Sequence, residues 1–527
     1  MQITPKNSPY VLGIDLGTSN SAIAVYMKGK AQIIPIDGDK MCPSVVSVDK
    51  GGEMVVGRAA RRRMMLDPEN TVSSIKREMG TSTTVKFPRL GDKEYTPIDI
   101  SAEILSKLVS SASEAEGIDL RGTPSHVVIC IPANFTDNQK NATIEAAKLA
   151  NLKVVELLEE PVAAAIAYGM ERERDQTILV YDLGGGTFDV SILNIDSSKG
   201  DNSKLEVLAK EGIQKLGGDD FDYKIMEIVS AKLQEISGLD IFDLKKDQGI
   251  KSSSLREAQQ KLKEAAENAK CELSESLTTQ IELPNLIKDE SGTIHNIDLE
   301  ITREQFNEAI RPLILQSKEA VDKALKSAKL TIEEISRIIL IGGSTRVPLV
   351  KEMLKEMFNK DPYIDKDPDT AVARGAAILA AWKGVPTDQL DVNEEVREED
   401  KPEGSIKISN IVTHYMGVEI KGRKFSCLLE KNTEIPADEF LTVSKEYTTP
   451  QDDMTELVIR VYQSENLEEY VSSDKIECIG EFFLTGIPAK PRGQEKIEIF
   501  FEIDRQNLLK VKAKSSSSSG ELEIKRS

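Results

Sequence analysis

Two glycine-rich turns constrain the fold of this chain more than any other feature of its sequence. Residues 13–21 read Gly-Ile-Asp-Leu-Gly-Thr-Ser-Asn-Ser, and residues 181–189 read Tyr-Asp-Leu-Gly-Gly-Gly-Thr-Phe-Asp. Apolar residues precede and follow each segment, so each is predicted to form a strand, a tight turn and a second strand. Because Asp-Leu-Gly recurs at the same place in both, we expect two related halves of the chain to face each other.

The composition of the two turns suits the binding of phosphate. Glycine has no Cβ, so the backbone N–H groups of such a turn can approach a phosphate closely, and Thr and Ser hydroxyls add donors. Asp15 and Asp182 open the turns and are placed to hold Mg²⁺ through water. One such turn alone is most often an ordinary hairpin turn, so the prediction depends on the pair. Neither turn has the Gly-x-x-x-x-Gly-Lys-Ser/Thr pattern of a P-loop.

Length and charge exclude several classes of protein. The 527 residues exceed what one core supports. The net charge of −20 disfavours nucleic-acid and anionic-membrane partners, because the phosphate interaction would be repulsive. Five scattered cysteines and three histidines favour neither a zinc site nor a disulfide framework. The N-terminus lacks a signal-peptide pattern and no apolar run is long enough to span a bilayer, so we expect a cytoplasmic location.

The periodicity divides the chain into three parts. Residues 1–384 alternate β-branched runs with helical periods, which is typical of an α/β domain. Residues 385–405 contain eight acidic and two basic side chains as well as two prolines, so they are predicted to form an exposed interdomain linker. Residues 406–527 change to a period of two and are predicted to form a compact β-sandwich.

Several elements can be placed within these parts. Strands are predicted at 127–131, 153–157, 178–181 and 337–341, and in the last part at 406–409, 417–420, 456–462, 496–503 and 509–514, with Leu522 and Ile524 on a return strand. A capping box at Thr136 predicts a helix start, as does Pro161 at a first-turn position. An apolar stripe from Leu255 to Leu273 has helical spacing and predicts packing against a core.

Four further segments accompany the turns: Ser-Ile-Lys-Arg at 74–77, Glu-Glu-Pro-Val-Ala-Ala-Ala at 159–165, Gly-Gly-Asp-Asp-Phe-Asp at 217–222 and Gly-Gly-Ser-Thr-Arg-Val-Pro at 342–348. Together and in this order they closely resemble the 70-kilodalton heat-shock chaperones of the DnaK type. The resemblance implies an α/β actin-like ATPase of two duplicated lobes with ATP or ADP in the cleft, followed by an all-β sandwich domain.

The resemblance also implies roles for individual residues. Asp15 and Asp182 would hold Mg²⁺ through waters, Asp189 would lie near potassium or water, and Lys76 would orient the attacking water, with Glu160 and Thr187 completing the catalytic set. Phosphoryl transfer needs this kind of positioning and charge neutralisation more than covalent help. The implied nucleotide contacts are Gly17, Thr18, Ser19, Asn20, Gly184, Gly185, Gly186, Thr187, Gly217, Gly218, Asp219, Glu267, Lys270, Ser274, Gly342, Gly343, Ser344, Arg346 and Asp369.

Two departures from the family concern communication between the domains. Pro132 matches a proline that relays the nucleotide state, but Lys140 stands where the family usually has an arginine, and lysine lacks the planar fork. The family's linker is a short Leu-rich segment that docks on the ATPase, whereas this chain offers only residues 390–392 or 406–412 as apolar candidates. A charged tether buries less apolar area, so we expect altered or lost coupling.

The β domain carries further departures. Lys421 and Glu446 fall at positions where the family has an apolar and a small residue that arch over a bound peptide, while Leu457 still suits the floor of a central pocket. Charges at these positions would weaken an apolar arch or favour charged segments. No helical lid follows the last strands, which fits either a lidless protein or a shortened chain, and bound peptide would then leave faster.

Two functions remain open at this point. The first is an ATP-dependent chaperone that hydrolyses ATP to ADP and phosphate to control its hold on unfolded or extended polypeptides, together with a J-domain co-chaperone and a nucleotide exchange factor. The second is a nucleotide-gated interaction protein whose β domain binds one specific partner. A sugar kinase of the actin-like fold is a weaker alternative, because a C-terminal β-sandwich has no place in it.

Overall fold

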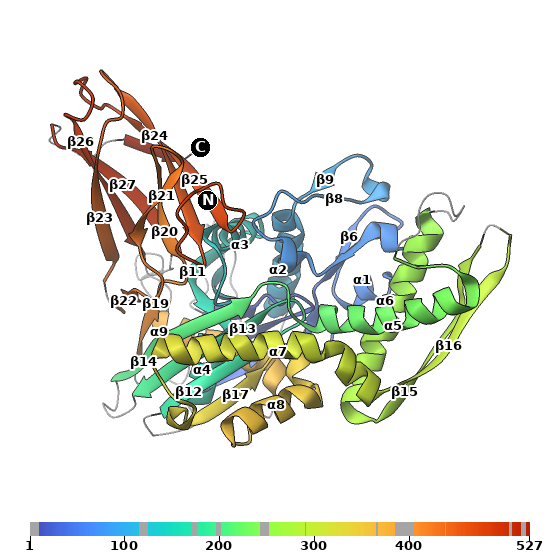
Figure 1. Ribbon diagram of the computed structural model, residues 1–527. Helices are drawn as coiled ribbons and strands as arrows, with labels where there is room; N and C mark the ends of the chain where they lie inside the picture. The colour runs from blue at the N-terminus through green and yellow to red at the C-terminus, as the bar shows by residue number, and fades with distance from the viewer. Residues whose placement is uncertain are drawn as a thin grey trace, which may run out of the picture.

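The computed structural model describes most of the chain (Figure 1). The described residues are 10–114, 125–169, 176–196, 202–242, 252–289, 291–364, 367–384, 405–437, 439–504, 508–517 and 523–526. The predicted linker lies outside them except for its last residue, and so do the docking candidate at 390–392 and Leu522.

The first lobe is built on a mixed sheet. Its strand order is β11 (Leu152–Glu159), β10 (Ser125–Ile131), β1 (Val11–Asp15), β2 (Asn20–Met27) and β3 (Lys30–Ile33), and the short β4 (Cys42–Pro43) also pairs with β2. The hairpin β1–β2 is antiparallel, whereas β10 and β11 add in parallel. The first glycine-rich turn therefore lies at the end of this hairpin, as predicted.

The second lobe repeats this topology. Its sheet has the order β18 (Tyr363–Ile364), β17 (Arg337–Ile341), β12 (Gln176–Leu183), β13 (Phe188–Asp196) and β14 (Asn202–Ile213), which then continues to β19 (Ser405–Ile411) and β22 (Glu434–Ile435). The hairpin β12–β13 is again antiparallel and β17 adds in parallel. The second glycine-rich turn thus occupies the position of the first in a duplicated sheet.

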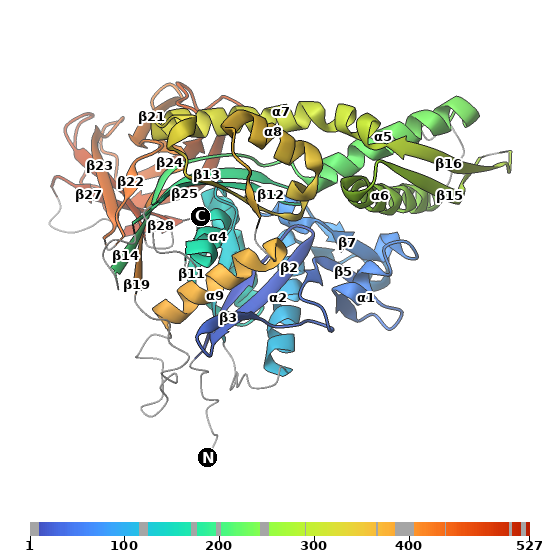
Figure 2. The same cartoon turned by 90° about the horizontal axis from the view of Figure 1, so that it is seen from below.

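Two helices lie between the sheets and join the lobes (Figure 2). Residues of α4 (Glu160–Gly169) and α9 (Ala371–Lys383) share one buried cluster with both sheets. The approach is close: a Cβ on Gly13 of β1 would lie 2.2 Å from the backbone N of Ala377, and one on Gly375 would lie 1.8 Å from the carbonyl oxygen of Ala163. Only glycine allows these contacts, so α9 packs directly on β1 and α4.

The outer faces carry the remaining helices. Helices α2 (Pro97–Glu114) and α3 (Asp137–Leu149) pack on the first sheet, and α5 (Gly218–Ser237), α6 (Ser252–Glu275), α7 (Arg303–Ala328) and α8 (Pro348–Phe358) share the core of the second. The predicted capping box at Thr136 is present. The predicted stripe on α6 is confirmed, because Ala258, Leu262 and Leu273 are fully buried in that core.

Smaller elements complete the lobes. The first lobe carries α1 (Arg58–Arg61), a three-stranded sheet of β6 (Met54–Val56), β5 (Val45–Val48) and β7 (Thr71–Ser73), and the hairpin of β8 (Val85–Lys86) with β9 (Glu94–Tyr95). The second lobe carries the long hairpin of β15 (Thr278–Lys288) with β16 (Ile294–Thr302), which the sequence analysis did not predict.

The C-terminal part is a β-sandwich, as predicted. One sheet has the order β21 (Lys424–Leu429), β20 (Tyr415–Ile420), β24 (Glu456–Ser464), β25 (Ile476–Thr485) and β28 (Glu523–Arg526), and the other has β23 (Leu441–Thr448), β26 (Lys496–Ile503) and β27 (Leu509–Ser515). Their inner faces share a core that includes Val461 and Phe501. The return strand β28 pairs with β25.

The strand β19 connects the sandwich to the second lobe. It pairs in parallel with β14 over Ser405 to Ser409, while β22 pairs with its far end. Ile411 is buried and Ile408 partly buried against the cluster between the lobes. The segment that was predicted to dock weakly therefore does dock. Backbone hydrogen bonds along the edge of β14 hold it there, in place of the apolar side-chain contacts that a leucine-rich linker would make.

Candidate functional site: the cleft between the lobes

The two glycine-rich turns face each other in the structure. A Cβ built on Gly185 would lie 2.1 Å from Ser19 Oγ, and one built on Gly186 would lie 2.9 Å from Thr18 Cγ2. The second turn therefore approaches the first to a distance that only glycine permits. The two turns therefore meet, as the sequence predicted, and their role in binding phosphate stays a prediction.

Two further glycine segments support the second turn. Gly218 N donates to the carbonyl oxygen of Gly184 at 3.0 Å, and Ser344 Oγ donates to the same oxygen at 2.8 Å. Gly217 lies so close that its Cβ would be 2.6 Å from the backbone of Gly185. The N-terminus of the 20-residue helix α5 thus holds this turn in place, because Asp219 N also donates to the carbonyl oxygen of Gly185 at 2.8 Å.

A buried ion pair lies at the centre of the cleft. Lys76, on the short 3-10 helix Ile75–Glu78, donates through Nζ to Glu160 Oε1 at 2.6 Å. Their side chains are 8% and 11% exposed. Glu160 opens α4, so the pair joins a loop of the first lobe to the helix between the two sheets.

The acids around this pair are more numerous than its single lysine can balance. Burial, with Glu160 as the second cause, raises the pKa of Asp15 to about 7 while Lys76 opposes the shift. Burial and Glu160 also raise the pKa of Asp189 to about 7 and that of Asp182 well above its ordinary range. Burial alone would lower the pKa of Lys76, but the neighbouring carboxylates raise it. The centre therefore favours the binding of an added cation.

The arrangement of these acids fits a cation held through water. Among the residues that the structure describes, no three His, Cys, Asp or Glu side chains are grouped closely enough to ligate a metal directly. Mg²⁺ retains several of its waters in proteins and uses few carboxylates. The donor set of Asp15 and Asp182 in an acidic surrounding is consistent with that mode of binding.

The residues predicted to frame adenosine lie on α6 and around the 3-10 helix Gly343–Arg346. Lys270 and Ser274 are neighbours on α6, where Ser274 Oγ donates to the carbonyl oxygen of Lys270 at 3.0 Å. Arg346 pairs with Asp369 at 2.6 Å. A Cβ on Gly218 would lie 3.1 Å from Lys270 Nζ, so α6 borders the start of α5, which supports the second turn. These assignments stay predictions.

Side chains that the sequence analysis did not pair bridge the cleft. Arg61 Nη2 donates to Glu267 Oε2 at 2.7 Å, and Arg77 Nη2 donates to Asp220 Oδ2 at 2.7 Å. Ser74 Oγ donates to Asp219 Oδ2 at 2.8 Å. A basic segment at 74–77 and an acidic one at 219–220 were visible in the sequence, but nothing in it placed them opposite each other.

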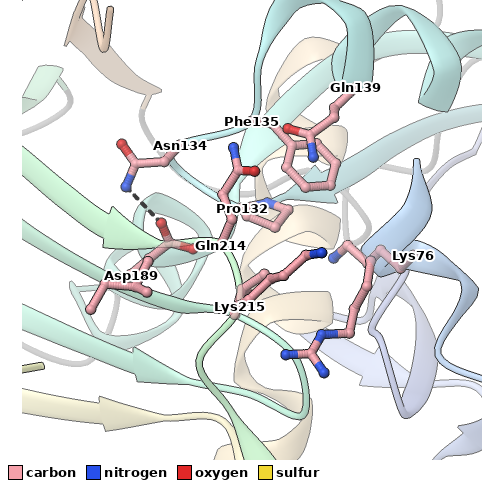
Figure 3. Close-up of a pocket in the computed structure, with 11 residues that line it drawn as sticks. Lys76, Pro132, Asn134, Phe135, Gln139, Asp189, Gln214 and Lys215 are labelled. Carbon is pink, nitrogen blue, oxygen red and sulfur yellow. Dashed lines mark hydrogen bonds between the residues drawn. The ribbon is translucent and has the colours of Figure 1, made fainter. Parts of the chain in front are cut away.

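A narrow cavity of about 30 Å³ lies beside the ion pair (Figure 3). Residues of both lobes line it, and Pro132, the predicted relay residue, forms part of its wall. The full lining is Lys76, Arg77, Pro132, Asn134, Phe135, Gln139, Thr187, Asp189, Ile213, Gln214 and Lys215. Asn134 Nδ2 donates to Asp189 Oδ1 at 2.8 Å across this wall.

The second predicted relay residue, Lys140, lies where α3 meets the sandwich. Its side chain is buried, and burial lowers its pKa while Glu159, Asp137 and Asp504 act to raise it. Asp137 joins the two parts directly, because its Oδ1 accepts from Leu509 N at 3.1 Å. Lys140 therefore contributes to the contact between the ATPase lobes and the β domain without the forked geometry of an arginine.

The three predicted peptide-site residues are spread over the sandwich. Lys421 is exposed in the turn between β20 and β21, and Glu446 is exposed on β23, where it pairs with Lys496 at 2.8 Å. Leu457 on β24 is partly buried against the sandwich core. Their role in holding a peptide stays a prediction.

The fold and the cleft define a two-lobed actin-like ATPase joined to a β-sandwich, and the comparisons with known proteins agree. The sequence model of the family described as Hsp70 protein matches residues 11–527. The chain is 42% identical over 516 residues to the chaperone protein DnaK of Thermotoga neapolitana, covering 97% of this chain and 79% of the relative. It is 41% identical over 509 residues to that of Thermosipho africanus, covering 96% and 78% respectively.

The chain therefore belongs to the Hsp70 family, of the DnaK type. It is an ATP-dependent chaperone that binds ATP and ADP and hydrolyses ATP, which decides between the two functions that the sequence left open. The family works on unfolded polypeptides together with co-chaperones. Among the described residues, no helix is long and apolar enough to cross a bilayer.

Proposed function

We propose that the cleft hydrolyses ATP with Lys76 as its central catalytic residue. The observation that carries this proposal is the buried Lys76–Glu160 pair, which lies among Asp15, Asp182 and Asp189. Lys76 orients the attacking water and stabilises the charge that develops on the γ-phosphoryl group. Glu160 holds the ammonium group in place and accepts from a water, and Thr187 donates to the transferred group.

The turns hold the nucleotide. Backbone N–H groups of residues 17–20 and 184–186 contact the phosphates, and the hydroxyls of Thr18 and Ser19 add donors. Residues 217–219 and 342–344, with Glu267, Lys270, Ser274, Arg346 and Asp369, frame the adenosine. The closeness of Gly185 to Ser19 and of Gly217 to Gly185 supports this assignment.

Asp15 and Asp182 hold Mg²⁺ through waters, and Asp189 binds K⁺ or a water. The raised pKa values of these buried acids support a bound cation, because a cation favours their charged forms. Mg²⁺ bound there would neutralise charge on the β- and γ-phosphates. The chain's own part is to position the waters around the ion and exclude bulk solvent.

The proposal also divides the chain into an ATPase domain that ends at residue 384, a linker at 385–405 and a β domain from residue 406. In it, β19 couples the ATPase domain to the β domain. Lys210 of β14 is fully buried and donates to Glu159 Oε1 at 2.6 Å. Asn410 of β19 completes the group: its Nδ2 donates to Glu159 Oε1 at 3.0 Å and its Oδ1 accepts from Lys210. Glu159 directly precedes Glu160, so the docked strand contacts the neighbour of the catalytic pair, with Pro132 and Lys140 as the relay.

The remaining parts of the proposal concern partners and location. The β domain holds extended polypeptide segments over Leu457, beneath an arch that includes Lys421 and Glu446. A J-domain co-chaperone and a nucleotide exchange factor act on the ATPase lobes. The chain works in the cytoplasm, a location supported by its scattered, unpaired cysteines.

Substituting Lys76→Ala tests the assignment of the catalytic residue. We expect single-turnover hydrolysis to fall by roughly 10²–10³-fold, because the lost interaction acts in the transition state. ATP affinity, measured by calorimetry, should change less than about tenfold. The control is Lys50→Ala, which removes the same charge from an exposed position. Hydrolysis by Lys76→Ala at the unmodified rate would remove Lys76 from the mechanism.

A further inference from the structure

The side chain of Asn134 connects the two lobes beside the catalytic pair. Asn134 lies between β10 and α3 of the first lobe, whereas Asp189 lies on β13 of the second. Its Nδ2 donates to Asp189 Oδ1 at 2.8 Å, as the dashed line in Figure 3 shows. Asp189 is 2% exposed, and a hydrogen bond to a buried carboxylate is stronger than one to a neutral acceptor. One lobe therefore holds a side chain of the other.

Gly212 of β14 leaves the space that this hydrogen bond occupies. It is the partner of Asp189 in the register of β13 and β14. A Cβ on Gly212 would lie 2.1 Å from Asn134 Nδ2 and 2.5 Å from Asp189 Oδ1. Its φ is not in the left-handed region, so the backbone of β14 does not itself require glycine here. The missing side chain makes room for the amide and the carboxylate together.

Asn134 is the side chain that orients the carboxylate of Asp189. Among the described residues, no other side chain donates a hydrogen bond to it. Burial and the neighbouring Glu160 raise the pKa of Asp189, whereas the Asn134 amide acts to lower it. Because Oδ1 accepts from the amide, Oδ2 is the oxygen left for the K⁺ or water that the proposed mechanism places on Asp189. A buried carboxylate without this donor would lose both its partner and its fixed orientation.

We propose that Asn134 is a positioning residue for ATP hydrolysis, which holds the Asp189 carboxylate in the orientation that cleavage requires. The inference rests on the proposed role of Asp189 beside the catalytic pair. The donor belongs to the first lobe and the acceptor to the second, so the carboxylate is oriented only while the lobes keep this spacing. Asn134 acts through Asp189, and its loss therefore slows cleavage more than it weakens the binding of ATP.

Asn134→Leu removes the donor at nearly the same side-chain volume. In a single turnover with labelled ATP, we expect cleavage to slow by about 10- to 100-fold, because misplaced groups cost rates of this order. ATP affinity, measured by calorimetry, should stay within about threefold of the parent value. Asn466→Leu, at an exposed position of the β domain, is the matched control and should cleave at the parent rate. A loss of affinity as large as the loss of rate would overturn the proposal.

Gly212→Ala disturbs the same contact without changing either partner, because the added Cβ takes the place of the amide. We expect a loss of cleavage similar to that of Asn134→Leu. The two changes combined should be within about twofold of the slower single variant, since changes that break one contact are not additive. Losses that multiply would mean that the glycine and the asparagine act separately, which would also overturn the proposal.

Exchanging the partners separates positioning from a simple tie between the lobes. Asn134→Asp together with Asp189→Asn keeps a hydrogen bond but moves the carboxylate to the first lobe, so cleavage should stay slow. Recovery of the parent rate would show that the bond only ties the lobes. Cleavage by Asn134→Leu at the parent rate, with Asp189→Asn slow, would overturn the inference and leave the role of Asp189 intact. If Asp189→Asn alone cleaved at the parent rate, the proposed role of Asp189 would itself fail.

Discussion

The two lobes are built on sheets of the same topology, but only one of them continues into the β domain. In the first lobe the strand order ends at β3, a strand of four residues. In the second lobe the corresponding strand β14 has twelve residues and accepts β19 along its edge. A longer edge offers more unpaired N–H and C=O groups to a docking strand. The duplication thus gives a symmetric cleft, and the unequal edges decide which lobe's sheet is extended by β19.

The contacts within the cleft also differ from those at the place where β19 docks. The cleft is formed by both lobes alike, through Gly185 against Ser19 and Gly186 against Thr18. Where β19 docks, the buried polar groups are a trio of three different origins: Lys210 of β14 in the second lobe, Glu159 of β11 in the first lobe and Asn410 of β19. A buried charge pair is costly unless its remaining hydrogen bonds are satisfied, so the docked strand stabilises the pair and the pair fixes the strand.

The largest effect is expected where the lobes meet. Gly185→Ala places a Cβ about 2.1 Å from Ser19 Oγ and forces the turns apart. We expect ATP affinity, measured by calorimetry, to fall by roughly 10–100-fold, as overpacking typically costs about 1–3 kcal/mol. In Gly184→Ala the nearest atom to the new Cβ is 3.9 Å away, so its loss should be much smaller. Equal losses in both variants would mean that the turns do not depend on their close approach.

A smaller effect is expected where β19 docks on β14. Asn410→Asp puts a second carboxylate beside buried Glu159 and removes an amide donor. Docking should weaken by about 1.5–3 kcal/mol, which hydrogen exchange of the β19 amides would report. The β3 amides serve as an internal reference, because β3 ends the sheet of the first lobe and pairs with no strand of the β domain.

Adding Glu159→Gln to Asn410→Asp removes the like charge and leaves Lys210 to pair with the new acid. Protection of β19 should then recover at least in part. No recovery in the double variant, or no loss in the single one, would show that β19 docks through its backbone alone.

The smallest effect is expected from pH, through the titration of His414 next to the docked strand β19. His414 is buried, and burial, with Lys140 and Lys431 as further causes, lowers its pKa to about 3. Its Nδ1 is within 2.8 Å of Thr413 Oγ1. An undocked histidine titrates near 6.5, so docking is fully stabilised above that pH and is weakened as pH falls below it. One pH unit below 6.5 should cost about 1.4 kcal/mol.

Exchange of the β19 amides between pH 7 and pH 5, corrected for intrinsic rates, would measure this weakening. His414→Gln should flatten the dependence, because glutamine does not titrate. A dependence of equal size in the variant would assign the effect to other groups.

Much of the fold was predictable because it depends on local pattern. The apolar runs around each turn predicted the hairpins β1–β2 and β12–β13, and the capping box at Thr136 and the stripe on α6 are local signals of helices. Several strands were not predicted: the hairpin β15–β16 and the strands β21, β23 and β25. Charged residues interrupt their alternation of apolar and polar side chains, or neighbouring turns leave their ends without a clear sequence signal.

The sequence by itself determined the composition of the cleft: two turns in which glycines, hydroxyls and an aspartate stand at matching places. Tertiary structure alone decided which distant charges meet. Arg77 pairs with Asp220 across 143 residues, and Lys210 contacts Asn410 across 200. Local patterns reflect the geometry of one strand or helix, whereas these pairs depend on how whole lobes and the docked strand pack, and a buried charge is stable only where that packing supplies its partner.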